Sequence, residues 1–303
     1  MDVLMKKTCV AVLPEERSRP IRFIKVLLFS ASVMPAVVAG ALAWTGGYGG
    51  LSEWLLAGLG LLIGQAGADY LYYHFTNFHT DSRDAHSKIF AGWRPLFIGG
   101  PLKNEQSLYA GALCLLAALL IGIRFLFLLG PAVLWLVLAG GLVSIFFTPM
   151  MLRGLKEPVV FLTFGPLCMS GIDFVMTHKF RLAPVIASLP VGFLVTVVAY
   201  LKGARYKVVE AGGSEVILNL KPWLAGILLT LAYLALLGAS LSGFVSGWAL
   251  LGLLTVPFSA ILYRRLRTQK RITDYLWATV FSLVVFITTC LLMALGMFLG
   301  NRI

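Results

Sequence analysis

The sequence predicts an all-α fold: a polytopic membrane bundle of about nine transmembrane helices, with residues 1–303 forming a single integral-membrane domain. Hydrophobic residues make up 59% of the chain and charged residues only 13%, and the mean hydropathy is +0.89. This balance is typical of a protein whose solvent is lipid. The apolar residues gather in runs long enough to cross a bilayer, and the basic residues fall in the short gaps between these runs.

Each predicted helix corresponds to one apolar run of about 20 residues, the length that spans the hydrocarbon core. A tail, 1–20, precedes the first run and is expected to be cytoplasmic. Arg124 is the only charge between the third and fourth runs, and Gly130-Pro131 favours a break there. The nine runs occupy 23–45, 53–75, 107–122, 130–148, 157–176, 184–201, 223–242, 244–263 and 276–299.

The distribution of Lys and Arg predicts the orientation of the chain. If the N-terminus is cytoplasmic, 21 of the 25 basic residues lie in cytoplasmic segments, and the four exceptions are Arg124, Lys179, Arg181 and Arg302. This asymmetry places the N-terminus in the cytoplasm and the C-terminus outside, in the cytoplasmic (inner) membrane. The formal net charge of +12 therefore reflects membrane orientation, and we expect no nucleic-acid partner.

The long loop after the second run contains the first candidate site. Asn77, Asp81 and Asp84 supply oxygen ligands of the kind that hold Mg²⁺ while sharing it with substrate phosphates. Lys88 and Arg94 follow, and would neutralise diphosphate oxygens. The alternative is a solvated loop whose charges only mark the membrane boundary.

These residues resemble the first motif of the UbiA prenyltransferase superfamily, Asn-Asp-x-x-Asp-x-x-x-Asp, which is followed by an Arg-Pro-Leu element. Asn77 and Asp81 match the motif in spacing, Phe78 stands at its second position, and Asp84 falls one residue early. Arg94-Pro95-Leu96 matches the downstream element. In helix number and order the resemblance covers most of the chain.

A second block of sequence is similar to the menaquinone branch of the superfamily, which prenylates 1,4-dihydroxy-2-naphthoate. A Phe-Gly-Pro inside a membrane helix is the most specific part of this block, although small residues there also let membrane helices approach closely. The block comprises Arg153-Gly154-Leu155-Lys156-Glu157, Phe164-Gly165-Pro166, Gly171 and Leu189-Pro190-Val191-Gly192.

The second Asp-rich motif of the family is altered in this chain. Its pattern, Asn-x-x-Asp-x-x-x-Asp, falls on residues 200–207, with Gly203 and Lys207 at the acidic positions. Lys202, Arg205 and Lys207 would then bind an anionic headgroup directly, in place of one Mg²⁺. Two other interpretations stay open: the chain has lost ionisation chemistry and only binds a lipid or quinone, or these cations simply follow the positive-inside rule.

Two carboxylates fall inside predicted membrane helices, where an ionisable group usually faces a cavity or a partner. Asp69 lies near the mouth of the expected site and is the stronger functional candidate. Asp173 would orient or deprotonate a phenolic acceptor, or else form a hydrogen-bonded contact between helices near the outer face. His74 and the two histidines after it lack the spacing of a helical metal site, so we expect no zinc or haem.

The resemblance implies an intramembrane prenyltransferase with Mg²⁺ as cofactor. Its partners would be an isoprenoid diphosphate donor, an aromatic or lipid acceptor, and membrane lipids. The alternative is a non-catalytic lipid- or quinone-binding membrane protein on the same fold, because fold does not imply function. The candidate catalytic residues are Asp81, Asp84 and Asp69; the metal ligands are Asn77, Asp81 and Asp84; the substrate-binding residues are Asn77, Lys88, Arg94, Glu157, Lys202, Arg205 and Lys207.

Overall fold

Helices make up almost all of the described fold. The computed structural model describes residues 27–79, 102–202, 206–208, 216–218, 221–268 and 272–301. Two short strands are present in these ranges, β1 (Tyr206–Val208) and β2 (Val216–Leu218). The helices are α2 (Ser30–Thr45), α3 (Leu51–His79), η3 (Asn104–Gln106), α5 (Ser107–Leu129), α6 (Ala132–Leu152), α7 (Lys156–Leu162), η4 (Thr163–Leu167), α8 (Cys168–Thr177), α9 (Leu182–Lys202), α10 (Pro222–Leu241), η5 (Gly247–Thr255), α11 (Val256–Thr268) and α12 (Ile272–Gly300).

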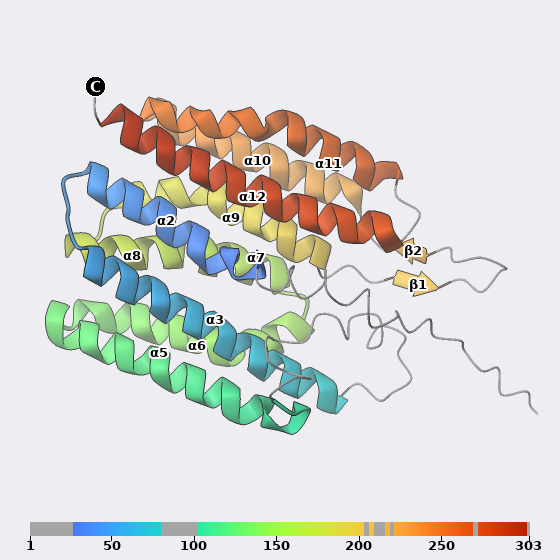
Figure 1. Cartoon of the computed structure of the whole chain (residues 1–303), viewed down its shortest axis with the longest axis horizontal. Coiled ribbons are helices and arrows are strands. Elements are labelled where there is room, and N and C mark those ends of the chain that lie inside the picture. The colour runs from blue at the N-terminus through green and yellow to red at the C-terminus, as the bar shows by residue number, and fades with distance from the viewer. Residues whose placement is uncertain are drawn as a thin grey trace, which may run out of the picture.

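The long helices form one bundle in which each segment runs antiparallel to the one before it (Figure 1). The C-terminal ends of α3, α6, α9 and α11 therefore meet the N-terminal ends of α5, α7, α10 and α12 at one end of the bundle, on the right in Figure 1. Segments far apart in the sequence are thus brought to the same end.

Eight helical segments in the described ranges are long and apolar enough to cross a membrane. The ninth apolar helix, α2, has 16 described residues and falls short of that length. The segments are Leu51–Thr76, Ser107–Leu129, Ala132–Leu152, Lys156–Thr177, Leu182–Lys202, Pro222–Leu241, Gly247–Thr268 and Trp277–Gly300. They correspond to the second to ninth predicted runs, so the prediction of a multi-helix membrane bundle is confirmed.

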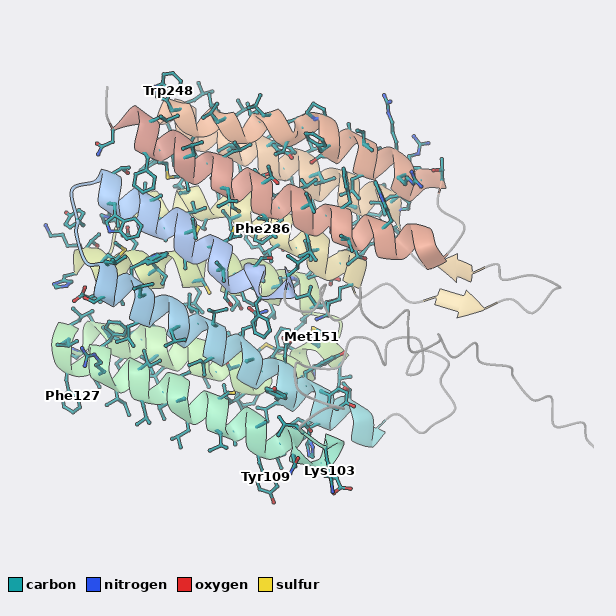
Figure 2. The ribbon with its side chains drawn as sticks, in the orientation of Figure 1. Lys103, Tyr109, Phe127, Met151, Trp248 and Phe286 are labelled. Carbon is teal, nitrogen blue, oxygen red and sulfur yellow. The ribbon has the colours of Figure 1, made fainter. Side chains whose placement is uncertain are left out.

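The outer surface of the bundle is apolar, which is the inverse of a soluble protein. Phe127 on α5 is 85% exposed and Trp135 on α6 is 74% exposed, whereas Phe286 on α12 is completely buried (Figure 2). Exposed Tyr109 and Trp223 lie in the first turns of helices at one end of the bundle, and Trp248 lies at the other. Exposed aromatic residues near both ends are typical of the two membrane–water interfaces.

A π-helical turn interrupts the segment formed by α7 and α8 at the Phe-Gly-Pro sequence. Pro166 has no N–H to donate to the α-helical ladder, and the wider turn η4 forms around it. Here Gly165 packs on α9, since a Cβ added to it would lie 3.1 Å from the Cα of Gly192. The two motif blocks that carry the menaquinone-branch resemblance therefore touch, and their glycines act as packing positions.

The segment predicted as the eighth run differs from a uniform α-helix. Its first half is the 3₁₀-helix η5, which packs against the C-terminal half of α12. A Cβ on Gly296 would overlap the carbonyl oxygen of Trp248, and one on Gly300 would overlap the hydroxyl of Ser246. This close backbone approach, which only glycine allows, accompanies a 3₁₀ run longer than is usual.

The connections contain one confirmed prediction and one difference. The break expected at Gly130-Pro131 is present, because α5 ends at Leu129 and α6 begins at Ala132. The predicted loop after the sixth run contains the antiparallel pair of β1 and β2, with Tyr206 opposite Leu218. The β-branched and aromatic residues of these short segments favour an extended backbone, which a search for helical runs does not detect.

Candidate functional site

The described basic residues are concentrated at one end of the bundle, here called the basic end. Nine of the twelve described Lys and Arg residues lie there, and Arg124, Lys179 and Arg181 lie toward the other end. The nine are Lys103, Arg153, Lys156, Lys202, Lys207, Lys221, Arg264, Arg265 and Arg267. The candidate site lies at this end, because Asp69, Glu157 and Lys202 all lie on helices toward it.

Asp69 and Lys202 are close although they are separated by more than a hundred residues. Asp69 is partly buried on α3, two to three turns before that helix ends at His79. Lys202 is the last residue of α9. The Asp69 carboxylate interacts electrostatically with the Lys202 ammonium group, so the structure brings together two of the residues assigned to the site from sequence.

Lys156, the first residue of α7, reaches the same place from a third helix. Its ammonium group donates a hydrogen bond to the carbonyl oxygen of Ala199, in the last turn of α9. It also interacts electrostatically with Lys202 and with its neighbour Glu157. Among the described residues, no carboxylate lies within ion-pairing distance of Lys156.

Glu157 belongs to the same group of charges and is partly buried. Tyr200, on α9, interacts electrostatically with it. The Tyr200 hydroxyl accepts a hydrogen bond from the backbone N–H of Lys221 at 2.8 Å and lies 3.2 Å from the Lys221 carbonyl oxygen. This contact fixes the end of α9 against the start of α10, and with it the position of Lys202.

Lys156 is the residue that sequence reasoning missed. It belongs to the block that resembles the menaquinone branch, but no role was assigned to it. The available signal was a lysine beside Glu157 at the start of an apolar run, next to a predicted cytoplasmic boundary. That signal does not say which helix faces the lysine, so its contact with α9 could not be read from the sequence.

The remaining predicted site residues are not covered by the described side chains. The backbone of Asn77 belongs to the last turn of α3, and that of Lys207 to β1, opposite Ile217. Asp81, Asp84, Lys88, Arg94 and Arg205 lie outside the described residues. Their roles stay predictions.

The described side chains at the basic end do not fit a Mg²⁺ site. Mg²⁺ prefers several oxygen ligands in a compact octahedron. Asp69 and Glu157 are carboxylates, but Lys202 and Lys156 interact electrostatically with them, and the two ammonium groups would repel a divalent cation. Across the described part of the chain, no group of three or more His, Cys, Asp or Glu side chains could hold a metal ion. The predicted Mg²⁺ ligands Asn77, Asp81 and Asp84 are not among the residues that this observation covers.

The intramembrane Asp173 lies at the opposite end and has a structural partner. Its side chain is buried and accepts two hydrogen bonds from Arg181: Nε donates to Oδ2 at 2.9 Å, and Nη2 donates to Oδ1. These bonds raise the pKa of the Arg181 guanidinium, which also lies over the Tyr48 ring, 5.2 Å from its centroid. The structure favours the interpretation of Asp173 as a hydrogen-bonded contact near a membrane surface.

The described histidine of the first candidate site makes a contact between helices. The Nδ1 atom of His74 on α3 lies 3.4 Å from the Ser107 hydroxyl at the start of α5. This polar contact helps to join the two helices near the basic end.

The fold and the burial pattern define a polytopic α-helical membrane protein. No protein-family model matches the chain, and a search among curated proteins finds no significant match. The resemblance to the UbiA superfamily therefore rests on the motifs quoted above.

Proposed function

We propose that this protein is a UbiA-like intramembrane prenyltransferase of about nine transmembrane helices, with its active site at the basic end. In this proposal it transfers an isoprenoid group from a diphosphate donor to an aromatic or lipid acceptor. The basic end faces the cytoplasm of the inner membrane, by the positive-inside rule.

The observation that carries the proposal is that electrostatic interactions link Asp69, Glu157 and Lys202: Asp69 interacts directly with Lys202, and Glu157 is linked to Lys202 through Lys156. They come from α3, α7 and α9, and each was assigned to one site by sequence reasoning. Asp69 lies inside a membrane-spanning segment, where a charged group is expensive and usually faces a cavity or a partner. Lys156, which also reaches this group, adds a second cation.

The charges suit the bonds that must break and form. The bond between C1 of the isoprenoid and the diphosphate oxygen breaks, and the diphosphate leaves with the electron pair. C1 then bonds to a carbon or oxygen of the acceptor, which loses a proton. Lys202 and Lys156 would stabilise charge on the leaving diphosphate, and Asp69 or Glu157 would accept the proton. A Mg²⁺ held by Asn77, Asp81 and Asp84 would supply further neutralisation of phosphate charge.

A non-catalytic lipid- or quinone-binding protein on the same fold is the second candidate. The altered second motif favours it, because Gly203 and Lys207 stand where the family carries acids. A protein without that metal site would keep the fold and the anion-binding cations but would not ionise a donor.

Turnover by the purified protein separates the two candidates. The full chain in nanodiscs is given farnesyl or geranylgeranyl diphosphate, Mg²⁺, and a panel of phenolic and naphthoate acceptors, and prenylated products are measured by mass spectrometry. We expect the wild type to transfer the isoprenoid group. Asp69→Asn and Glu157→Gln are compared with the control Glu53→Gln, which lies at the opposite end of the helix that carries Asp69. Whichever of these two variants removes the proton acceptor should turn over at least about tenfold more slowly than the wild type. The control should turn over at the wild-type rate. Absence of product with every acceptor, from folded protein that still binds the donor, would support the binding protein instead.

A further inference from the structure

Two lysines on facing helices lie near each other at the basic end. Lys156 begins α7, Lys202 ends α9, and the two helices pack against each other. The Lys156 ammonium group donates a hydrogen bond to the carbonyl oxygen of Ala199, three residues before Lys202, and the two lysine side chains interact electrostatically. Like charges that meet in a partly buried place repel each other, and a bound anion removes that repulsion.

The position of the Lys156 ammonium group is fixed by one hydrogen bond and leaves capacity for others. Ala199 is among the last four residues of α9, whose carbonyl groups lack a partner within the helix. Lys156 donates one N–H to this carbonyl. An ammonium group has three N–H donors, and the other two have no partner among the described residues.

The nearby carboxylates do not take up these donors. Glu157 interacts with Lys156 through space, and Asp69 does so with Lys202, but neither forms an ion pair with Lys156. The two carboxylates therefore offset part of the positive charge while leaving the Lys156 donors available. In the sequence, two more basic residues, Arg205 and Lys207, occur within five positions after Lys202.

We propose that Lys156 and Lys202 form a phosphate-binding pair that holds the diphosphate of an isoprenoid donor without a metal ion. Ammonium groups bind phosphate oxygens as point charges through charge-assisted hydrogen bonds. The hydrogen bond to Ala199 positions Lys156 toward the end of α9, so that one phosphate group can contact both lysines. This inference rests on the proposed function for the identity of the ligand, whereas the phosphate chemistry follows from the lysine pair alone.

The test measures binding of farnesyl diphosphate to the full-length protein in detergent, in EDTA and in Mg²⁺. We expect the wild type to bind in EDTA and Lys156→Gln to weaken that binding by about tenfold. Lys156→Arg, which keeps the charge, should retain most of the affinity. Lys179→Gln, a cation at the other end of the bundle, should bind as the wild type does. Farnesol, which has no phosphate, should bind equally to all four proteins.

Two competition experiments, one with inorganic diphosphate and one with a phospholipid, identify which kind of molecule supplies the phosphate. If inorganic diphosphate competes with farnesyl diphosphate and phosphatidylglycerol nanodiscs do not, the site is for the donor. Stronger competition by phosphatidylglycerol would overturn the assignment to an isoprenoid diphosphate in favour of a lipid headgroup.

The alternative to a ligand role is that Lys156 only caps α9. In that case Lys156→Gln would lower the midpoint of thermal unfolding and leave the affinity in EDTA unchanged, which would overturn the proposal. The Lys202→Gln variant provides a second test. If both lysines contact one phosphate, the double variant should lose less binding free energy than the sum of the losses in the two single variants. If binding in EDTA depends on Lys156 but no isoprenoid group is transferred, the proposed enzyme activity is contradicted and the lysine pair is supported. If the Lys156→Gln variant transfers the isoprenoid group and binds the donor as tightly as the wild type does, the lysine pair is contradicted and the enzyme activity is supported.

Discussion

Asp69 and Asp173 both lie in membrane-spanning segments, near opposite ends of the bundle, and their surroundings differ. Asp173 accepts two hydrogen bonds from one guanidinium group, which fits both of its oxygens. Asp69 interacts with Lys202 at longer range, in a group that contains a second lysine and a second carboxylate. Asp173 and Arg181 therefore form a closed pair, in which each group satisfies the other. In the group around Asp69, two N–H donors of Lys156 are available to a ligand.

The closed pair should contribute strongly to stability. We expect Arg181→Ala to lower the free energy of unfolding by about 3 kcal/mol, because it leaves the Asp173 carboxylate buried without a partner. Thermal unfolding in detergent measures the effect, and Lys179→Ala, an exposed cation in the same connection, is the control. Equal midpoints for the two variants would contradict the role assigned to the pair.

A buried network of hydroxyl groups joins three helical segments away from the candidate site. The Tyr233 hydroxyl on α10 lies 2.8 Å from the Thr255 hydroxyl and 2.6 Å from that of Ser259. Thr255 in turn lies 2.7 Å from the hydroxyl of Thr289 on α12. Such bonds join membrane helices where no water competes for the groups.

Removing one hydroxyl from this network should have a moderate cost. Tyr233→Phe is expected to reduce stability by about 1 kcal/mol, since the partner hydroxyls lose a hydrogen bond in a buried place. Tyr109→Phe, on a side chain that is 70% exposed, is the matched control and should be neutral. A midpoint of thermal unfolding for Tyr233→Phe equal to that of the control would show that the network has no net stabilising effect.

At the scale of elements, glycines decide how closely the helices pack. Gly165 meets Gly192 where η4 crosses α9, and Gly296 meets the backbone of η5. Both contacts bring two backbones together at positions where a side chain would separate them. Both irregular helical segments, η4 and η5, therefore pack through glycine.

The contact between η5 and α12 gives a sharp prediction. Alanine is normally a better helix former than glycine by about 1 kcal/mol, so Gly→Ala at an open helical position should be neutral or stabilising. Gly140→Ala on α6 fits that description, because a Cβ there meets nothing within 4 Å. Gly296→Ala should destabilise instead, because its Cβ would overlap the Trp248 carbonyl. The difference is measured by thermal unfolding, and a Gly296→Ala variant as stable as Gly140→Ala would contradict the close packing.

For the whole molecule, the distribution of charge predicts one orientation in the membrane. The exposed residues Lys103, at the basic end, and Lys179, at the other end, mark the two sides (Figure 2 labels Lys103). The positive-inside rule predicts that the first faces the cytoplasm and the second faces outward.

Cysteine labelling tests this orientation. In a chain whose native cysteines are replaced, Lys179→Cys should react with an impermeant thiol reagent in intact cells, and Lys103→Cys should react only after the membrane is opened. The physical reason is the cost of moving loop cations across the bilayer during insertion. The reverse labelling pattern would place the proposed active site on the outer face.

The sequence determined the features that depend on local pattern. Apolar runs of about 20 residues predicted the membrane-spanning segments, because each helix satisfies its own backbone hydrogen bonds and needs only lipid around it. Gly130-Pro131 marked the break between α5 and α6 in the same way, through backbone preferences of the residues themselves. For the candidate site, local pattern singled out Asp69 as a carboxylate inside an apolar run, and the motifs that resemble the UbiA superfamily singled out Glu157 and Lys202.

The tertiary structure decided which of these groups meet. Asp173 had two interpretations until Arg181, eight residues later, was found to bond to it. Lys156 had no assigned role until α7 was seen to pack on α9 and bring its ammonium group to Ala199. The 3₁₀ form of η5 likewise accompanies contact with α12, in which Gly296 lies 48 residues after Trp248. Periodicity and composition describe each helix separately, whereas these contacts depend on the rotation and spacing of neighbouring helices, which packing of side chains and glycines sets only in the assembled bundle.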